Sequence, residues 1–320
     1  MNGVKIVGTG KALPSNRVTN DDLSKVVDTT DEWIKSRTGI STRYLSKGET
    51  TTQLAIEAAK AAMLDGGIDP ETIDLIIVAT ITPDSVMPST ACLVQEAIGA
   101  TRATAFDITA ACSGFLYASM VAADAIKLGR SETALIIGAE VLSKVVNWED
   151  RATCVLFGDG AGAAVYQKTH KNNIINIYSE SDGASGNALT LSGRKLNNPY
   201  FKDDTELGHM YMDGRAVYKF ATHVVPSSIE KVLEGTGVGM QDVDMFILHQ
   251  ANERIMDSVA KKIGVDSTKF FKNLANYGNT SAATIPIALS EAKEFLKPGD
   301  KVVLCGFGGG LTWGSMLLEW

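Results

Sequence analysis

The sequence is short of cysteine, of positive charge and of long apolar runs, and each shortage excludes a class of protein. Its 320 residues contain four cysteines and no Cys-x-x-Cys pair, so we expect reduced thiols rather than disulfides or a zinc site. No apolar run is long enough to span a membrane, and the segment after Met1 lacks the apolar core of a signal peptide. The net charge of -7 disfavours nucleic acid as the main partner. These absences predict a cytoplasmic protein with no membrane, nucleic-acid or metal partner.

The composition that is present is typical of a globular enzyme. Hydrophobic residues make up 45% and charged residues 21% of a chain long enough for one large domain or two ordinary ones. Continuous apolar runs, of the kind found in strands buried on both faces, alternate with helical segments. The expected strands of this kind cover residues 74–79, 134–138, 244–248 and 301–306. This alternation predicts an α/β fold in which layered sheets are covered by helices.

The two halves of the chain repeat one layout. An apolar strand precedes each of Cys112 and Asn279 at a similar distance, and a further strand follows each of them at a similar distance. We infer two copies of one β/α unit, a first half at residues 1–170 and a second half at residues 171–320. In this interpretation Cys112 and Asn279 occupy equivalent strand-to-helix turns.

Cys112 has the surroundings of a nucleophile. Phe106 and Ile108 belong to a segment that predicts a buried strand, and good helix formers follow from Phe115 onward. Cys112 is therefore expected where a strand ends and a helix begins. The free amides and the positive dipole end of a helix start favour a thiolate over a thiol, and a thiolate is the nucleophilic form. The alternative is a small buried cysteine of the core.

Two polar residues occupy related places in the second half. His249 directly follows the strand at 244–248, at the carboxyl end of a strand, where sites of α/β folds gather. Asn279 precedes a helix, where its plain alternative role is a helix cap. A histidine in such a place is more often structural when it stands alone. Cys112, His249 and Asn279 together supply a nucleophile and two hydrogen-bonding groups.

A dinucleotide site is rejected. Residues 158–163 match the pattern Gly-x-Gly-x-x-Ala, but the sequence that follows leaves no room for the helix that this fingerprint requires.

Several motifs carry a resemblance that extends over essentially the whole chain. They are Asp31-Glu-Trp-Ile, Arg37-Thr-Gly-Ile, Ala110-Ala-Cys-Ser-Gly-Phe, Leu156-Phe-Gly-Asp-Gly-Ala-Gly, His249-Gln-Ala-Asn, Tyr277-Gly-Asn-Thr-Ser-Ala-Ala and Gly306-Phe-Gly-Gly-Gly-Leu-Thr-Trp-Gly. In this order they resemble the β-ketoacyl-acyl carrier protein synthase III family of the thiolase superfamily.

The resemblance implies a thiolase-like fold, with two pseudo-duplicated halves in an αβαβα layering, and a homodimer. It implies an acyltransferase that initiates type II fatty acid synthesis. Such an enzyme condenses an acyl-CoA primer, here expected to be acetyl-CoA, with malonyl-acyl carrier protein, and releases 3-oxoacyl-acyl carrier protein, CoA and CO2. No cofactor is expected, because the reaction proceeds through an acyl group on Cys112.

The resemblance also implies roles for individual residues. Cys112, His249 and Asn279 would form the family's catalytic triad, and the backbone amides of Cys112 and Gly309 would hold the oxyanion of the acyl group. The residues expected to bind CoA are Trp33, Arg37, Arg151 and Asn252, those expected to contact the carrier protein are Gln250, Ala251, Asn252, Glu253 and Arg254, and the one expected at the end of the acyl pocket is Met87. Met87 departs from the phenylalanine of many relatives, which leaves the preferred primer open.

The segment after His249 has a basic helical face. Arg254, Ser258, Lys261 and Lys262 recur at helical spacing, and Ile255, Met256, Val259 and Ile263 form the opposite stripe. A solvated surface is the ordinary explanation of such a pattern. Because the helix begins within a turn of His249, we expect its basic face at the mouth of the site, where it could attract an acidic carrier protein.

Three other functions remain open from the residues. A condensing enzyme of secondary metabolism could share the triad and load a different acyl group. A papain-like thiol hydrolase also has Cys, His and Asn in this chain order, but the repeated layout and the absence of Cys-Gly-x-Cys-Trp/Tyr around Cys112 count against it. A catalytically inactive scaffold that binds carrier protein is disfavoured by the intact triad.

Overall fold

The first half of the chain forms a five-stranded sheet. The computed structural model describes residues 2–206 and 208–320. The strand order is β1-β7-β6-β4-β5, in which β4 runs parallel to β5 and β6, and β7 runs antiparallel to β1 and β6. The strands are β1 (Gly3–Ala12), β4 (Leu75–Ala79), β5 (Thr104–Ile108), β6 (Thr133–Glu140) and β7 (Gly160–Thr169).

The second half forms a four-stranded sheet with the matching order β13-β14-β15-β8. Its strands are β8 (Ile174–Ser181), β13 (Met245–Leu248), β14 (Lys301–Gly308) and β15 (Thr312–Glu319). Where the first sheet has β5, this sheet has a single parallel bridge between Phe246 and Phe270. The first sheet ends at residue 169 and the second begins at residue 174, so the two sheets divide the chain close to the predicted junction.

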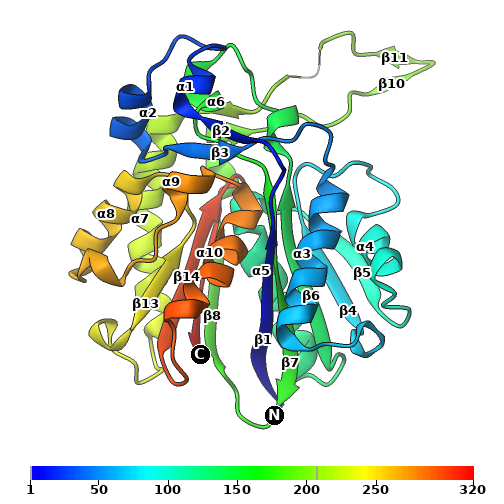
Figure 1. The fold of residues 1–320 in the computed structure, drawn as a ribbon, viewed down its shortest axis with the longest axis vertical. Helices are drawn as coiled ribbons and strands as arrows, with labels where there is room; N and C mark the ends of the chain where they lie inside the picture. Colours follow the sequence, from blue (N-terminus) through cyan, green and yellow to red (C-terminus); the bar gives the residue numbers. More distant parts are fainter. Residues whose placement is uncertain (1, 207) are drawn as a thin grey trace.

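Helices fill the space between the sheets and cover their outer faces (Figure 1). The buried central layer contains α5 (Gly114–Lys127) and α10 (Thr284–Ala292), each in contact with strands of both sheets. The outer helices are α3 (Thr51–Gly66) and α4 (Thr90–Ile98) over the first sheet, and α7 (Gly214–Leu233) and α8 (Glu253–Ile263) over the second. The layering is αβαβα, and the predicted fold class is confirmed.

The expected central strands are confirmed. Every residue of β4 and of β6 is buried, as a continuous apolar run between two helical layers predicts. The helix α3 begins after Thr50, whose hydroxyl accepts from the Gln53 amide, and ends at Gly67 in the left-handed conformation. The glycine fingerprint that was rejected as a dinucleotide site lies at the start of β7 and leads into no helix.

The two halves repeat one layout, and Cys112 and Asn279 lie at equivalent turns as predicted, but at different positions within those turns. Each half has a short 3-10 turn before its central helix, η2 (Ala111–Ser113) and η7 (Ser281–Ala283). Each turn contains one non-glycine residue with positive φ, 45° at Ala111 and 50° at Ser281. This geometry pairs Cys112 with Ala282 and places Asn279 three residues earlier in the turn. The spacing of strands and helices along the chain predicted the correct pair of turns, because element lengths repeat in the two halves. Which residues match within those turns depends on the backbone conformation of each turn, which the spacing does not show.

The strand before Cys112 is also less buried than predicted. β5 pairs only with β4 and forms the edge of its sheet, and its residues are half-buried or exposed. Aromatic and β-branched residues at its positions 106 and 108 predict a strand correctly, but composition does not distinguish an edge strand from a central one.

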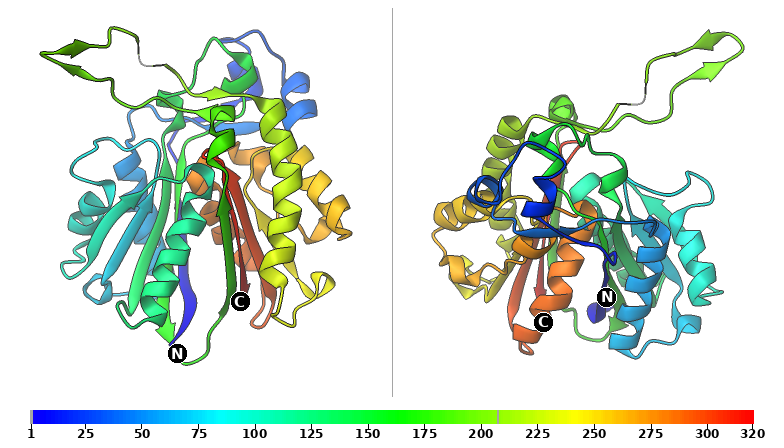
Figure 2. Two further views of the ribbon diagram at one scale, coloured as in Figure 1. Left: turned by 180° about the vertical axis from the view of Figure 1, so that it is seen from behind. Right: turned by 45° about the horizontal axis from the view of Figure 1, so that its top comes forward.

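Small elements cover the ends of the strands from which the central turns emerge (Figure 1). They include β2 (Arg17–Thr19), β3 (Thr42–Tyr44), α1 (Asn20–Leu23), α2 (Asp31–Thr38), α6 (Arg151–Cys154) and α9 (Leu274–Tyr277), with β9 (Leu189–Thr190) paired to β12 (Tyr211–Met212). A hairpin of β10 (Asn197–Asn198) and β11 (Phe201–Lys202) projects away from the body in both views of Figure 2. The remaining 3-10 helices are η1 (Pro70–Thr72), η3 (Leu142–Lys144), η4 (Gly183–Ala188), η5 (Met240–Asp242), η6 (Ser267–Lys269) and η8 (Lys293–Phe295). Within the described residues, the structure has no helix that is both long and apolar enough to cross a membrane.

Candidate active site

Cys112 lies in the turn that joins β5 to α5, as predicted. The left-handed φ of 45° at Ala111 is a conformation that alanine rarely adopts, so the turn is strained immediately before Cys112. Gly308 packs so closely against the turn that a β-carbon there would lie 2.7 Å from the Cys112 nitrogen. The backbone of Cys112 is thereby fixed, and Gly309, which directly follows β14, lies beside the same turn.

The Cys112 thiol is protonated in the resting protein. Cys112 is only 7% exposed, and burial raises the pKa of its thiol to about 12. The Ser281 hydroxyl oxygen accepts from the thiol at 3.5 Å, and the nearby Glu140 carboxylate raises the pKa of the thiol further. Burial therefore works against the thiolate that the sequence predicts at the helix start. The thiol has to lose its proton as it reacts.

His249 follows β13 directly and is held as a neutral imidazole. It is 2% exposed, and burial lowers its pKa to about 3. Its Nδ1 lies 2.6 Å from the Thr284 hydroxyl, and its ring packs edge-on against Phe307 with a centroid separation of 5.1 Å. These contacts fix the ring plane, so that Nε2 is the nitrogen left to meet a ligand.

The Thr284 hydroxyl decides which nitrogen of His249 carries the proton. This hydroxyl has one proton, and it lies 2.6 Å from His249 Nδ1 and 3.1 Å from the Ser281 carbonyl oxygen. When the proton goes to the carbonyl, His249 can only accept through Nε2. When it goes to Nδ1, Nε2 carries a proton and donates. The donor form is the one that can stabilise a negative charge on a ligand.

Asn279 is oriented by its own turn. Its Oδ1 accepts from the Ser281 amide at 2.8 Å, which leaves the Nδ2 amino group to donate elsewhere. Its backbone amide donates to the Leu156 carbonyl at 2.8 Å, and its carbonyl accepts from the Gly158 amide at 3.0 Å. Asn279 does not cap α10, whose N-cap is Ala283. The alternative interpretation of Asn279, as a residue that caps the helix α10, is therefore wrong.

All three predicted triad residues line one cavity of about 1520 Å³. Ser281 and the glycine-rich end of β14 line it as well. The first half of the chain supplies the thiol, and the second half supplies the two hydrogen-bonding side chains. A cavity of this size suits an elongated ligand. Chemically, the arrangement offers a nucleophile beside two donors for a developing negative charge.

An aromatic and cationic cluster lies at one side of the cavity. The guanidinium carbons of Arg37 and Arg151 lie 5.1 and 4.9 Å from the centroid of the Trp33 ring. Trp33 and Arg37 line the cavity, whereas Arg151 is reached through Trp33 and donates to the Asp28 carbonyl at 2.9 Å. Two positive charges beside a planar ring suit a ligand that carries phosphates and an aromatic base.

Asn252 performs a structural task at the same side. It is the N-cap of α8, where Oδ1 accepts from the Arg254 amide at 2.9 Å, and Nδ2 donates to the Arg37 carbonyl at 3.1 Å. Both ends of its amide are thus occupied within the chain, although Asn252 also lines the cavity. The residue joins the end of α2 to the start of α8, and so positions Arg37 relative to Arg254.

The carrier-protein contacts predicted after His249 need one correction. Gln250 is 1% exposed, and its amide is used by the backbone of neighbouring segments, so it cannot touch a docking protein directly. Ala251 lines the cavity. Glu253 packs against Gly39 and lies 3.3 Å from the Lys272 ammonium. The residue that directly follows a site histidine faces the core here because the chain turns at the end of β13.

The predicted faces of α8 are confirmed. Ile255, Met256 and Val259 are buried, together with Ala260, and Ile263 is half-buried. The basic residues Arg254, Lys261 and Lys262 are exposed, and Ser258 is half-buried. Arg254 also lines the cavity. The basic face therefore reaches the opening of the site at its Arg254 end.

Met87 does not lie where it was predicted. Its side chain is 87% exposed, and it is absent from the lining of the cavity in its own chain. Val86, next to it, is 93% exposed. Met87 cannot close the acyl end of the cavity within one chain, and a role there would require a neighbouring copy. Sequence position alone does not say whether an apolar loop residue points inward.

Three site residues were missed by the sequence analysis. Ser281 contacts the sulfur, Thr284 contacts His249, and Glu140 accepts a hydrogen bond from Ser281 at 3.1 Å. A signal for Glu140 existed, because it is the one charged residue of β6, a largely apolar strand. Ser281 and Thr284 carried no such signal, since hydroxyl residues are common at helix starts.

Two family descriptions match the chain. "3-Oxoacyl-[acyl-carrier-protein (ACP)] synthase III" matches residues 106–183, and the C-terminal part of the same family matches residues 233–320. The curated "Beta-ketoacyl-[acyl-carrier-protein] synthase III" proteins of Clostridium novyi and Clostridium acetobutylicum are 53% and 52% identical to it. These alignments cover the whole of this chain and at least 99% of each relative.

Solved structures agree in fold over nearly the whole chain. The 3-oxoacyl-[acyl-carrier-protein] synthase III of Aquifex aeolicus is 46% identical, with a TM-score of 0.93 over 99% of this chain and 100% of that one. The priming β-ketosynthase of the R1128 polyketide pathway is 32% identical, with a TM-score of 0.91 over 99% and 96%. OleA of Xanthomonas campestris, at 22% identity and a TM-score of 0.86 over 99% and 98%, shares the fold.

Proposed function

Because the chain belongs to the 3-oxoacyl-[acyl-carrier-protein] synthase III family, we propose that it performs the initiating condensation of type II fatty acid synthesis on an acyl-CoA and malonyl-acyl carrier protein. The observation that carries this proposal is the meeting of Cys112, His249 and Asn279 at one cavity. The fold counts against a papain-like hydrolase, since both halves of a thiolase-like architecture build the site.

In the first half-reaction the Cys112 sulfur attacks the carbonyl carbon of the acyl-CoA thioester. A new carbon–sulfur bond forms, the tetrahedral oxyanion is held by the backbone amides of Cys112 and Gly309, and the bond to the CoA sulfur breaks. The acyl group stays on Cys112, and CoA leaves as a thiol. Trp33, Arg37 and Arg151 hold the nucleotide end, because their charges and ring match its phosphates and base.

In the second half-reaction malonyl-acyl carrier protein takes the place of CoA. Its carboxylate leaves as CO2, and the electron pair passes to the thioester as an enolate. His249 Nε2 and Asn279 Nδ2 donate to the developing oxyanion in a site from which water is largely excluded. The carbanion then attacks the acyl carbon on Cys112 and displaces the sulfur, which gives 3-oxoacyl-acyl carrier protein.

This course needs no cofactor, since loss of CO2 supplies the carbanion. We place the protein in the cytoplasm, where its four unpaired thiols would stay reduced.

We also propose a homodimer. The exposed apolar side chains of Val86 and Met87 support it, because a monomer would leave them in water.

Mass spectrometry of the intact protein after incubation with a panel of acyl-CoA thioesters tests the proposal. We expect one acyl group per chain, on Cys112, and acetyl-CoA among the donors that react. The alternative is a priming enzyme of secondary metabolism, favoured by the 32% identity to the R1128 synthase, and preferential acylation by a donor other than acetyl-CoA would support it. If no donor acylated Cys112, the proposed function would be wrong.

The basic end of α8 leads to a prediction about carrier-protein docking. The net charge of the chain is -7, so an acidic partner has to be attracted by a local positive patch. We expect Arg254→Glu, or Lys261→Glu with Lys262→Glu, to raise the KM for malonyl-acyl carrier protein about tenfold. Acylation by acetyl-CoA should stay within about twofold of normal, because CoA is held by other residues. Steady-state kinetics of each half-reaction measures both.

Lys60→Glu is the matched control, because Lys60 is an exposed lysine on α3, over the other sheet. It changes the net charge by the same amount as Arg254→Glu and should leave the KM unchanged. Added salt should weaken binding to the unmodified protein and have little effect on Arg254→Glu. Equal damage to both half-reactions, or to neither, would place docking elsewhere on the surface.

A further inference from the structure

Glu140 is a buried carboxylate that the course above leaves without a task. It ends β6 and is 0% exposed, although the rest of that strand is largely apolar. No basic side chain forms an ion pair with it anywhere in residues 2–206 or 208–320. A buried carboxylate without a cation is costly unless hydrogen bonds satisfy it.

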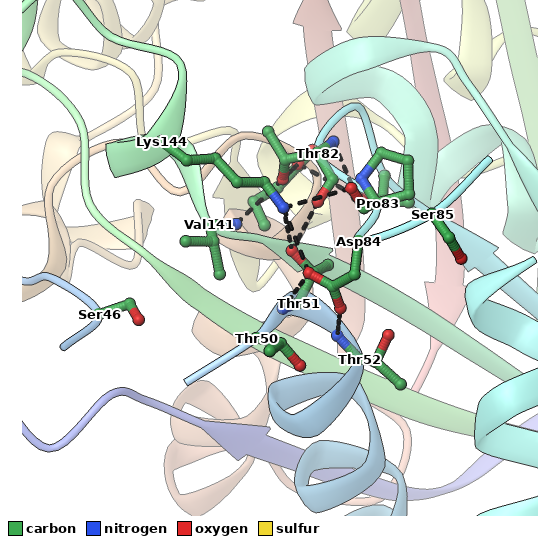
Figure 3. Close-up of polar contacts among 12 residues, drawn as sticks. Ser46, Thr50, Thr51, Thr52, Thr82, Pro83, Asp84, Ser85, Val141 and Lys144 are labelled. Carbon is green, nitrogen blue, oxygen red and sulfur yellow. Dashed lines mark hydrogen bonds and ion pairs between the residues drawn. The ribbon is translucent and has the colours of Figure 1, made fainter. Parts of the chain in front are cut away.

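The hydrogen bonds around Glu140 all point toward its carboxylate. Thr82 donates at 2.5 Å and Thr80 at 3.3 Å, and the Ile81 amide lies 3.2 and 3.3 Å from the two oxygens. Thr82 is itself held by the Val141 amide, which donates to its hydroxyl oxygen at 3.0 Å (Figure 3). An ionised carboxylate only accepts hydrogen bonds, so this set of donors suits the charged form.

Ser281 connects this carboxylate to the reacting sulfur. The Ser281 hydroxyl donates to Glu140 Oε1 at 3.1 Å. Its oxygen, Ser281 Oγ, lies 3.5 Å from Cys112 Sγ. Because the hydroxyl proton is given to Glu140, the oxygen is left to accept the Cys112 S–H. The Asn279 side chain holds the Ser281 amide at 2.8 Å, and the left-handed backbone of Ser281 fixes the direction of its side chain.

We propose that Glu140 takes the Cys112 proton through the Ser281 hydroxyl as the thiol attacks the acyl-CoA thioester. The thiol proton moves to Ser281 Oγ, and the Ser281 proton moves to the Glu140 carboxylate, while the carbon–sulfur bond forms. When the bond to CoA breaks, the departing thiolate takes a proton back along the same path. No net proton is gained, and Glu140 is again a carboxylate. Ser281 contacts the reacting sulfur, whereas Glu140 acts through Ser281 as a positioning residue.

Other groups in the site are poorer proton acceptors for this step. Burial lowers the pKa of His249 to about 3, and raises that of Glu140 to about 7. A base is most effective when its pKa lies near the working pH. Two charged groups lie on adjoining elements. Asp159 accepts hydrogen bonds from Ser46 and Ser143. The Lys144 ammonium donates to Thr51, Pro83 and Asp84 (Figure 3). Cys112, in the turn η2 before α5, is the titratable group that faces Glu140 from the first half's central turn.

The proposal rests on the acylation of Cys112 proposed above, and it is tested in that half-reaction. Ser281→Ala removes the linking hydroxyl but keeps the backbone that orients Asn279. We expect single-turnover acylation by acetyl-CoA to slow about 10²-fold, with no change in the decarboxylation of malonyl-acyl carrier protein. Ser290→Ala is the matched control, since this hydroxyl lies on α10 and donates to the Ile287 carbonyl. It should leave both steps unchanged.

The pH profile gives a second readout. In the unmodified protein, acylation should rise with pH through the pKa of Glu140, because only the carboxylate can accept a proton. Glu140→Gln should remove this rise, and acylation should then increase only at the alkaline pH where the thiol itself ionises. If Glu140→Gln does not fold, Ser281→Ala decides the question alone.

Two results would overturn the proposal. One is a normal acylation rate and pH profile in Ser281→Ala. The other is an equal loss of acylation and decarboxylation, which would show that Ser281 only supports the site. Neither can be confused with failure of the proposed function, in which the unmodified protein would not be acylated at all.

Discussion

Cys112→Ala is expected to abolish acyl transfer, with the rate of acyl-CoA turnover reduced on the order of 10⁴-fold or more. The reason is that the sulfur forms the covalent bond, and no other described residue of the cavity offers a cysteine thiol. Cys112→Ser should fail similarly, because an alcohol holds its proton more tightly than a thiol. Release of CoA and the mass of the intact protein measure the loss.

Decarboxylation separates the role of the sulfur from damage to the site. His249 and Asn279 stay in place in Cys112→Ala, so the variant should still release CO2 from malonyl-acyl carrier protein. Cys305→Ala is a control, because Cys305 is another buried cysteine and does not line the cavity. Acyl transfer that survived in Cys112→Ala would remove Cys112 from the mechanism.

His249→Ala or Asn279→Ala is expected to reduce decarboxylation of malonyl-acyl carrier protein by about 10²–10³-fold each, which is the effect of removing one donor from an oxyanion site. Acylation of Cys112 should continue, because these two donors serve the second half-reaction. Rapid-quench measurement of CO2 release and of acyl-protein reports the two steps separately.

Asn279→Asp sharpens this test. The aspartate keeps the oxygen that accepts from the Ser281 amide, and it replaces the Nδ2 donor with an acceptor. It should therefore lose decarboxylation while the local turn stays intact.

Thr284→Val should weaken the donor role of His249, because the hydroxyl no longer holds the imidazole proton on Nε2. Blocked acylation with normal decarboxylation in His249→Ala or Asn279→Ala would contradict this division of labour.

Much of the fold followed from local patterns. β4 and β6 were predictable because a strand buried on both faces has to be apolar at every position. The helix α2 was predictable because Thr30 and Gly39 mark its two ends. The edge position of β5 was not predictable, because it depends on which strands pair, and its residues look alike in either place.

The site divides in the same way. Residue types and order pointed to Cys112, His249 and Asn279, because few side chains can serve as nucleophile and donor at turns of a repeated β/α unit. The exposed position of Met87 and the buried position of Gln250 were hidden, since each depends on how a loop is oriented. The sequence also suggested a thiolate, whereas burial raises the pKa of the Cys112 thiol.

By itself, the sequence determined the layered α/β class, the repeated layout, and the three residues Cys112, His249 and Asn279 that the structure brings to one cavity. These depend on periodicity and residue type, which are local properties. Only the tertiary structure decided the burial of Cys112 and His249, the contact of His249 with Thr284, and the contact of Glu140 with Ser281. Glu140 and Ser281 lie far apart in the chain, and they meet because the turn η7 of the second half packs against β6, which Glu140 ends. A pKa or a proton path depends on burial and on such contacts, and neither is a property of a residue alone.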